Sequence, residues 1–422
     1  MKKLGKAFVL MVLTRQLKQL LAKHPVKIVG VVGSYGKTST KLALATVLSE
    51  GLRVRHQEGN YNDIVTVPLI FFGEDLPSLM NPIAWARLFA RNRRQIKQDY
   101  PYDVVIVELG TDGPGQVAAF KRYLELDIAV VTSIAYEHME FFADIAAVAN
   151  EELSVIDLSK QTIVNRDLCD PKYLTNNTVT TYGMNGGDYQ ALNSQVEGDS
   201  ISFTINKAGA QFLTASCFNS SQNVLYSAAA AVAVGDALGV AADTLAKGIA
   251  AIQPAAGRMR KFAGLNGSVI LDDSYNASPE AVKASLDALY AADAPQKIAL
   301  LGNMNELGSF SPAAHTDIGE YCDPVKLTEV LTLGPDANTY TAEAARQKGC
   351  KVTAFDSPYA AGRYLADKLQ SGTLVLVKGS QNKVFAEETV KLILANPDDA
   401  KQLVRQGTGW QKRKRKQFND AV

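Results

Sequence analysis

The run GSYGKTS at 33–39 joins glycines to a lysine and to hydroxyl side chains, a combination suited to binding phosphate. Gly33, Ser34 and Gly36 belong to a turn in which the glycines let the backbone bend and expose its N–H groups. The helix expected after this turn adds the positive end of its dipole. These residues therefore predict a phosphate-binding loop.

The residues that end this run could each contact a nucleotide or its metal ion. Lys37 can reach the β- and γ-phosphates, and the hydroxyl of Thr38 or Ser39 can hold Mg²⁺. The common spacing G-x-x-x-x-G-K-[ST] requires glycine at a position where this chain has Val31. A turn without a ligand is the alternative, but G-K-T-S directly after a buried strand favours a nucleotide site.

Polar side chains suited to hard cations follow two further buried strands. Glu108 ends the strand expected at 103–110, and His138 follows the strand expected at 127–134. In an open parallel sheet, ligands lie at the C-terminal ends of the strands. A lone histidine is more often structural than a ligand, but together the two residues fit Mg²⁺ coordination beside a triphosphate.

An acidic pair, Asp272 and Asp273, follows a strand in the second half of the chain. An aspartate there can hydrogen-bond ribose hydroxyls, and Arg258 upstream can contact phosphate as a bidentate donor. The sequence NASPE that follows is also typical of a helix start, so a turn or helix cap explains the aspartates equally well.

Strands and helices alternate along the chain. The apolar runs of the strands are continuous, which is typical of parallel sheets covered on both faces. The pattern restarts near 252–262, which places a hinge at Pro254–Gly257. The sequence predicts an α/β fold: a central P-loop-type ATPase domain at 26–255 with a mostly parallel sheet, and a Rossmann-like C-terminal domain at 256–398.

Three segments lie outside this pattern or interrupt it. Segment 1–25 predicts an amphipathic helix, because apolar residues recur at helical spacing through Leu21. Its apolar run is shorter than the roughly 20 residues that span a bilayer. Segment 77–101 predicts a basic amphipathic insertion. Each helix could pack on the protein or rest on an anionic membrane surface. The basic segment 399–422 is expected to be a solvated tail.

Composition sets broad limits on function. The 422 residues are 47% hydrophobic and 21% charged, with a net charge of +1, so no global field favours nucleic acid as a partner. The two amphipathic helices add the inner face of the membrane as a second location for a cytoplasmic protein. The cysteines form no C-x-x-C pair, which predicts reduced thiols in a cytoplasmic protein. They are Cys169, Cys217, Cys322 and Cys350.

Several motifs, in order, resemble those of the ATP-dependent Mur ligase family over about residues 26–395, and most resemble the members that add D-alanyl-D-alanine. The short loop G-x-x-G-K-[ST]-[ST] of that family accounts for Val31. The motifs are GSYGKTS (33–39), EGNYND with VPL (58–69), VIVELGTDGPGQ (105–116), TSIAYEHMEFF (132–142), GRMRKF (257–262), DDSYNASPEAV (272–282), LGNMNELG (301–308) and VKGS (377–380).

The resemblance implies a carboxylate–amine ligase that uses ATP and Mg²⁺. ATP would phosphorylate a substrate carboxylate to an acyl phosphate, which an incoming amine then attacks. Lys37, Arg258 and Mg²⁺ would neutralise the phosphate charge. The substrate expected is a small-molecule or peptide precursor of the cell wall, with no nucleic acid partner.

The resemblance also implies site residues. One Mg²⁺ would lie on Thr38 or Ser39 with Glu108, and a second on Glu108 with His138. The remaining residues would contact the nucleotide or the amine substrate: Asn60 and Asn62 near ATP, Asn223 at the adenine, Asp273 at the ribose, and Asn276, Lys378, Gly379 and Ser380 on the side of the amine substrate.

Two of the departures from the family pattern bear on the substrate and the metal site. Only about 25 residues precede the first strand, so the UDP-binding domain is expected to be missing or supplied by a partner protein. Glu152 occupies the place of a carbamylated lysine, where its carboxylate could hold metal or could simply be an exposed helix residue. A non-catalytic nucleotide-binding subunit, and a ligase for another amino-acid polymer, therefore stay open as alternatives.

Overall fold

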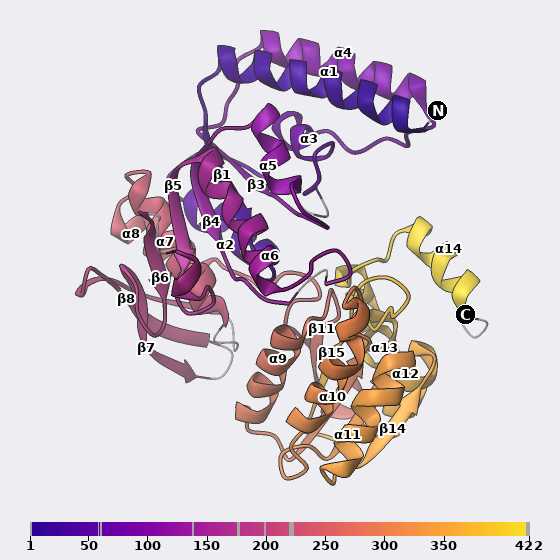
Figure 1. Ribbon diagram of the computed structural model, residues 1–422. Coiled ribbons are helices and arrows are strands. Elements are labelled where there is room, and N and C mark those ends of the chain that lie inside the picture. The colour runs from indigo at the N-terminus through magenta and orange to yellow at the C-terminus, as the bar shows by residue number, and fades with distance from the viewer. Residues whose placement is uncertain are drawn as a thin grey trace. The chain divides into compact units, whose positions relative to one another are not determined.

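The computed structural model forms two compact units (Figure 1). Unit 1 comprises Met1–Ala135 and Phe141–Gln253, and unit 2 comprises Tyr136–Glu140 and Pro254–Val422. The last of the three places where the chain passes between the units, Gln253 to Pro254, lies at the expected hinge. The structure describes residues 2–57, 59, 61–136, 139–174, 178–197, 200–218 and 223–418.

Unit 1 is built on a sheet that has nine strands in the described part of the chain, in the order β2-β3-β1-β4-β5-β6-β7-β8-β9. The pairs from β2 to β7 are parallel, and β8 is antiparallel to both of its neighbours. The predicted mostly parallel sheet is thus confirmed. The strands are β1 (Lys27–Val32), β2 (Val54–Arg55), β3 (Val104–Glu108), β4 (Leu126–Val131), β5 (Ser159–Asn165), β6 (Thr180–Gly183), β7 (Tyr189–Glu197), β8 (Ser200–Lys207) and β9 (Ala210–Phe218).

Helices cover both faces of this sheet, which explains the continuous apolar runs. Val29 and Val31 of β1 pack toward α2, α7 and α8, whereas Ile28 and Val32 pack toward α1, α3 and α5. The helices are α1 (Lys2–Lys23), α2 (Lys37–Ser49), α3 (Val67–Phe72), α4 (Pro82–Lys97), α5 (Gln116–Ala119), α6 (Ile145–Leu153), α7 (Asn223–Ala237) and α8 (Ala242–Ala250).

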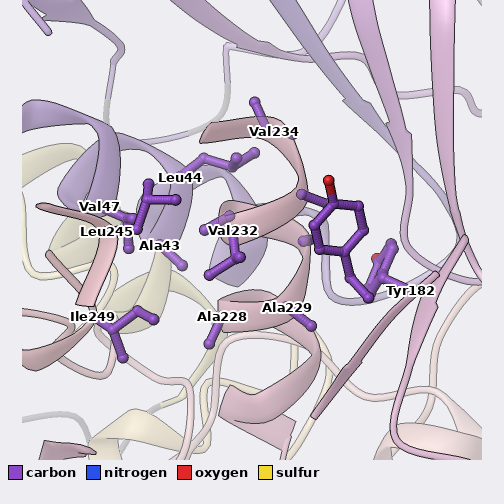
Figure 2. Close-up of a cluster of buried hydrophobic side chains, with 14 of the residues drawn as sticks. Ala43, Leu44, Val47, Tyr182, Ala228, Ala229, Val232, Val234, Leu245 and Ile249 are labelled. Atoms are coloured by element: carbon purple, nitrogen blue, oxygen red, sulfur yellow. The ribbon is translucent and has the colours of Figure 1, made fainter. Parts of the chain in front are cut away.

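The helix after the phosphate loop is held by this packing. Figure 2 shows Leu44 and Val47 of α2 beside Val232 of α7 and Leu245 of α8. The small alanine side chains of α7 let α2 approach closely. Because Leu44 is fully buried in this core, Leu44→Ala would leave a cavity and lower the free energy of unfolding by about 2–5 kcal/mol. The start of α2 is therefore fixed to a rigid core.

Segments 1–25 and 77–101 contain helices that pack on each other. In Figure 1, α1 and α4 lie side by side above α3. Leu13 of α1 and Trp85 of α4 share one buried cluster, and Asn92 donates to Oε1 of Gln16 over 3.0 Å. No helix in the described part of the chain is both long and apolar enough to cross a membrane.

Unit 2 has a six-stranded sheet in the order β10-β11-β15-β12-β13-β14 within the described residues. Of the five strand pairs described in this sheet, β10–β11 is antiparallel and the other four are parallel. This is the α/β arrangement that was expected. Its elements are β10 (Arg260–Ala263), β11 (Val269–Asp273), α9 (Pro279–Ala291), β12 (Gln296–Gly302), α10 (Ser311–Tyr321), β13 (Glu329–Leu333), α11 (Ala342–Gln347), β14 (Val352–Phe355), α12 (Pro358–Ala366), β15 (Thr373–Lys378), α13 (Glu387–Ile393) and α14 (Thr408–Gln417).

The basic C-terminal segment is not the solvated tail that the sequence predicts. Lys414 of α14 is fully buried, and its Nζ lies 2.8 Å from Glu387 and 2.5 Å from Glu388. Phe418 packs against Tyr359 and Phe385. The prediction was wrong because one cation in the run meets two carboxylates of α13, and a buried ammonium needs such partners.

The four cysteines are all free and buried. Burial raises the pKa of the Cys217 thiol to about 11 and that of the Cys322 thiol to about 12. Both thiols therefore stay protonated at neutral pH, as expected for unreactive structural cysteines.

Candidate nucleotide and metal site

The phosphate loop joins β1 to α2 and depends on two glycines with positive φ. Gly33 has φ +125°, and a Cβ there would lie 2.3 Å from Oγ1 of Thr132 and 2.8 Å from N of Ser133. Gly36 has φ 83° and forms the N-cap of α2. Both positions therefore require glycine, because other residues rarely adopt this backbone and no space exists for a side chain at Gly33.

The end of β4 holds the loop in shape through hydrogen bonds. The backbone N–H of Ser34 donates to the carbonyl of Ser133 over 3.0 Å, and the hydroxyl of Ser34 donates to the carbonyl of Ala135 over 3.1 Å. The N–H of Tyr35 donates to Oγ of Ser133 over 2.9 Å. The loop is therefore pre-shaped by its neighbouring strand.

The ammonium of Lys37 folds back over this loop. It donates to the carbonyl oxygen of Gly33, and to that of Ser34 over 3.0 Å. A cation at the N-terminal end of α2 adds to the helix dipole in attracting phosphate. Gly33, Ser34, Gly36 and Lys37 therefore lie together in this turn, and their contact with phosphate stays a prediction.

A hydroxyl and a carboxylate meet beside the loop. The hydroxyl of Thr38 donates to Oε2 of Glu108 over 3.1 Å, at the C-terminal end of β3. No hydrogen bond joins Ser39 to Glu108 in the described residues, so Thr38 is the better placed of the two candidates. Hydroxyl and carboxylate oxygens are ligands that Mg²⁺ accepts, and this pair fits such an ion.

Glu108 also has a buried partner that the sequence reasoning missed. Nζ of Lys41 lies 3.2 Å from Oε2 of Glu108, with 2% and 7% of the two side chains exposed. The available signal was a lysine on α2, three residues after Thr38 and therefore on the same face. Lys41 orients the Glu108 carboxylate and partly balances its charge.

Of the other metal and nucleotide candidates expected near the phosphate loop, some lie within the described residues and some do not. His138 and Asn60 lie outside the described residues, so both stay predictions. Asn62 accepts from the N–H of Gly110 through its backbone oxygen over 2.8 Å, close to the end of β3. Asn223 is the first residue of α7 and is exposed. Among the described residues, no three His, Cys, Asp or Glu side chains group to hold a metal ion.

Glu151 and Glu152 of α6 are both buried, and each accepts hydrogen bonds from different backbone N–H groups. Oε2 of Glu152 accepts from the backbone N–H of Gly33 over 2.8 Å, and 2% of Glu152 is exposed. Glu151 accepts from the N–H groups of Gly115 and Val117, which caps α5. Glu152 is therefore not an exposed helix residue. The structure attaches it to the phosphate loop.

In unit 2, Asp273 and Lys378 form a buried ion pair at neighbouring strand ends. Nζ of Lys378 lies 2.6 Å from Oδ2 of Asp273, and the side chains are 3% and 9% exposed. Oδ2 also accepts from Ser285 over 2.6 Å, and Oδ1 from the N–H of Met259 over 3.2 Å. Burial lowers the pKa of Lys378, although Asp273 opposes this shift. Both Asp273 oxygens thus have partners within unit 2, and its expected ribose contact stays a prediction.

The expected amine-substrate residues also lie together. Lys378 donates to the backbone oxygen of Asn276 over 3.0 Å, and Oγ of Ser380 donates to that of Ala277 over 3.1 Å. A Cβ at Gly379 would lie 2.9 Å from Cγ1 of Val384. The ends of β11 and β15 therefore form one compact polar cluster.

Arg258 stacks on an aromatic ring beside this cluster. Its Cζ lies 4.3 Å from the centroid of Tyr275, and its buried Nε has no hydrogen-bond partner among the described residues. Arg405 holds the loop that carries Tyr275: its guanidinium donates to the carbonyl of Tyr275 over 3.0 Å and to that of Ser274 over 2.5 Å. Arg405 is a second residue that the sequence reasoning missed.

Asp272, the neighbour of Asp273, is a buried carboxyl group with one satisfied oxygen. Oδ1 accepts from the hydroxyl of Ser274 over 2.5 Å, whereas Oδ2 has no partner in the described residues. Burial raises the pKa of Asp272 to about 6, and the hydrogen bonds from Ser274 oppose the shift. Asp272 therefore carries less charge than an exposed aspartate at mildly acidic pH.

The phosphate loop on a mostly parallel sheet, followed by a second α/β unit, defines a P-loop-type nucleotide-binding protein of two units. Two family models match the chain: the Mur ligase middle domain at 31–234, and the "Mur ligase, glutamate ligase domain" at 257–381. The chain belongs to the Mur ligase family.

The chain is similar to several curated proteins and solved structures. The chain is 27% identical over 388 residues to the UDP-N-acetylmuramoyl-tripeptide–D-alanyl-D-alanine ligase of Synechocystis, covering 89% of this chain and 76% of that protein. It is 26% identical to the Bacillus subtilis ligase of the same name, covering 90% and 78%. The MurF ligase of Thermotoga maritima in complex with ADP has a TM-score of 0.76 and 24% identity, covering 91% and 83%.

Proposed function

We propose that this chain is an ATP- and Mg²⁺-dependent ligase that joins a carboxylate to an amine on a peptidoglycan precursor. The observation that carries the proposal is the contact of Thr38 with Glu108 beside a pre-shaped phosphate loop. The relatives that are named D-alanyl-D-alanine ligases support a muramyl tripeptide as the carboxylate and D-alanyl-D-alanine as the amine.

The reaction has two steps. A substrate carboxylate oxygen attacks the γ-phosphorus of ATP, which forms an acyl phosphate and releases ADP. The amine nitrogen then attacks the acyl carbon, the C–O bond to phosphate breaks, and the amine proton leaves with the phosphate. The loop N–H groups and Lys37 bind the phosphates and hold them for the first step.

Thr38 and Glu108 would hold Mg²⁺, which offsets phosphate charge when it is bound. Lys41 keeps the Glu108 carboxylate in place through their 3.2 Å ion pair. In unit 2, Arg258 would contribute a guanidinium to phosphate, because its Nε is without a partner among the described residues. The cluster of Asn276, Lys378 and Ser380 would orient the amine substrate.

The reaction is proposed to occur in the cytoplasm, at or near the inner face of the membrane, where ATP and wall precursors meet. A partner protein that binds the UDP group is a further hypothesis. It predicts that adding this partner lowers KM for a UDP-linked precursor and leaves KM for a UDP-free peptide unchanged.

The test is ADP formation with candidate substrates. The full chain is incubated with ATP, Mg²⁺, muramyl tripeptide precursor and D-alanyl-D-alanine, and the peptide product is identified by mass spectrometry. We expect ADP and an amide product only when both substrates are present. ADP formation with a different amine would instead indicate a ligase that builds another amino-acid polymer. A chain that binds ATP but forms no ADP with any wall precursor would be the non-catalytic subunit.

A further inference from the structure

The two packed helices α1 and α4 concentrate positive charge. Their sequences hold six and five Lys or Arg residues, respectively, and neither contains Asp or Glu. The whole chain is nearly neutral, with 44 basic and 43 acidic residues. Among the described side chains of these helices, Arg91 is the one with a carboxylate partner, Glu74. The pair therefore presents unbalanced positive charge at one edge of unit 1.

On α1, an exposed stripe begins with apolar residues and continues with basic ones. Phe8 and Met11 are 57% and 61% exposed, and Arg15 and Lys18 follow on the same face, three and four residues apart. Exposed apolar side chains that gather beside cations mark an interaction surface more often than singly scattered ones do.

On α4, the same order of side chains recurs. Ile83 is 63% exposed, and Arg87, Arg94 and Lys97 follow it at helical spacing. Just before the helix, Met80 is 75% exposed. The apolar part again precedes the basic part.

The helices α1 and α4 run in the same direction, so their N-terminal halves lie at one end of the pair and their C-terminal halves at the other. Near their ends, Nζ of Lys23 donates to the carbonyl of Lys97 over 3.0 Å. Earlier along both helices, Nε2 of Gln16 donates to the carbonyl of Phe89 over 2.9 Å. The apolar starts therefore lie at the same end of the helix pair, and the basic halves follow toward the other end.

A groove of about 620 Å³ runs along α1 beside this stripe. Leu10, Met11 and Thr14 contribute to its lining, and basic side chains of Arg15, Lys18 and Arg122 border it. An apolar lining bordered by cations matches the acyl and phosphate parts of a lipid. Nucleic acid fits less well, because Phe8 is the one exposed aromatic side chain described on these two helices, and Trp85 is 4% exposed. A single ring gives no row of aromatic faces for successive bases.

We propose that the α1–α4 surface, made of Phe8, Met11, Arg15, Lys18, Met80, Ile83, Arg87 and Arg94, docks on an anionic lipid bilayer. The apolar members enter the headgroup boundary, and the basic members contact lipid phosphates. Docking would place the enzyme at the membrane surface. It goes beyond the ligase reaction, and it can be measured without ATP or substrate.

The test is flotation of the full chain with vesicles of phosphatidylcholine alone and of an equimolar mixture with phosphatidylglycerol. We expect binding to the mixed vesicles only. Replacing Arg15, Lys18, Arg87 and Arg94 by glutamine should weaken binding by about fivefold per charge, since each surface cation contributes roughly 1 kcal/mol. The matched control replaces Lys412, Arg413, Arg415 and Lys416 of α14 by glutamine, and should bind as the parent chain does.

A second variant tests the apolar contribution. Phe8→Ser with Met80→Ser should reduce the binding that survives physiological ionic strength, because burial of apolar area is not screened by salt. All the substituted side chains are exposed, and equal thermal unfolding of variants and parent would show that the fold is kept. Equal binding to both vesicle types, no binding to either, equal loss in the α14 control, or no effect of the serine variant would each overturn the proposal.

Discussion

Oε2 of Glu152 accepts a hydrogen bond from the backbone N–H of Gly33 over 2.8 Å, although 119 positions separate the two residues. The buried carboxylate therefore fixes the first residue of the phosphate loop. The sequence raised a different role for Glu152, that of a metal ligand in place of a modified lysine. The two roles predict different behaviour for conservative variants.

If Glu152 anchors the loop, Glu152→Gln keeps an acceptor for Gly33 and should lower ATP turnover by only a few fold. Glu152→Ala leaves the Gly33 N–H without its acceptor, so turnover should fall by about 10- to 100-fold, corresponding to roughly 1–3 kcal/mol. Steady-state ADP release measures both. A Mg²⁺ titration separates the roles, because a loop anchor leaves the half-saturating Mg²⁺ concentration unchanged. Loss of Mg²⁺ affinity in Glu152→Gln would restore the metal-ligand role.

The contact of Thr38 with Glu108 predicts unequal roles for two adjacent hydroxyls. Thr38→Ala should reduce Mg²⁺ affinity by at least about tenfold. Loss of a residue that only hydrogen-bonds to a metal ligand already costs about tenfold, and loss of a ligand itself should cost no less. Ser39→Ala is the matched control and should leave it nearly unchanged, while Thr38→Ser should retain most of it. Isothermal titration with Mg²⁺ and a non-hydrolysable ATP analogue gives these affinities. A larger loss in Ser39→Ala would reverse the assignment.

The Asp273–Lys378 pair predicts a strong, non-additive effect on stability. Asp273→Asn leaves a buried ammonium without its counter-charge and should cost about 3–5 kcal/mol. Lys378→Met should cost less, because Asp273 keeps its bonds from Ser285 and Met259. Native-state hydrogen exchange in β11 and β15 reports the opening free energy. A double variant no more stable than Asp273→Asn would argue against the unpaired ammonium as the cause.

Asp272 predicts a specific pH dependence of stability. Its pKa of about 6 in the folded chain exceeds the ordinary value of 3.8, so the folded state binds more protons between these values. The contribution of Asp272 to the free energy of unfolding is therefore fully present below pH 3.8. It is lost as the pH rises toward 6, by on the order of 2–3 kcal/mol.

Asp272→Asn should remove this dependence and stabilise the chain at pH 7.5. Urea unfolding of parent and variant at pH 4.5 and pH 7.5 measures the difference, and comparing the two chains cancels other titrating groups. An equal pH dependence in both chains would mean that Asp272 does not titrate in this range.

The nucleotide loop could be predicted because its parts are close in sequence. β1, Gly33, Gly36 and the start of α2 follow one another, and their backbone needs are local. The alternation of strands and helices likewise predicted both α/β units. Thr38 could not be separated from Ser39, since that choice depends on the direction of Glu108 at the end of another strand.

The sequence by itself determined the α/β class, the phosphate loop and the motifs of the family, because periodicity and short motifs are properties of neighbouring residues. Tertiary structure alone decided that Lys41 faces Glu108, that Glu152 meets Gly33, and that Lys414 is buried against Glu387. A charged side chain has many chemically acceptable partners. Only the packed fold, which removes it from water, determines which partner lies within hydrogen-bonding distance.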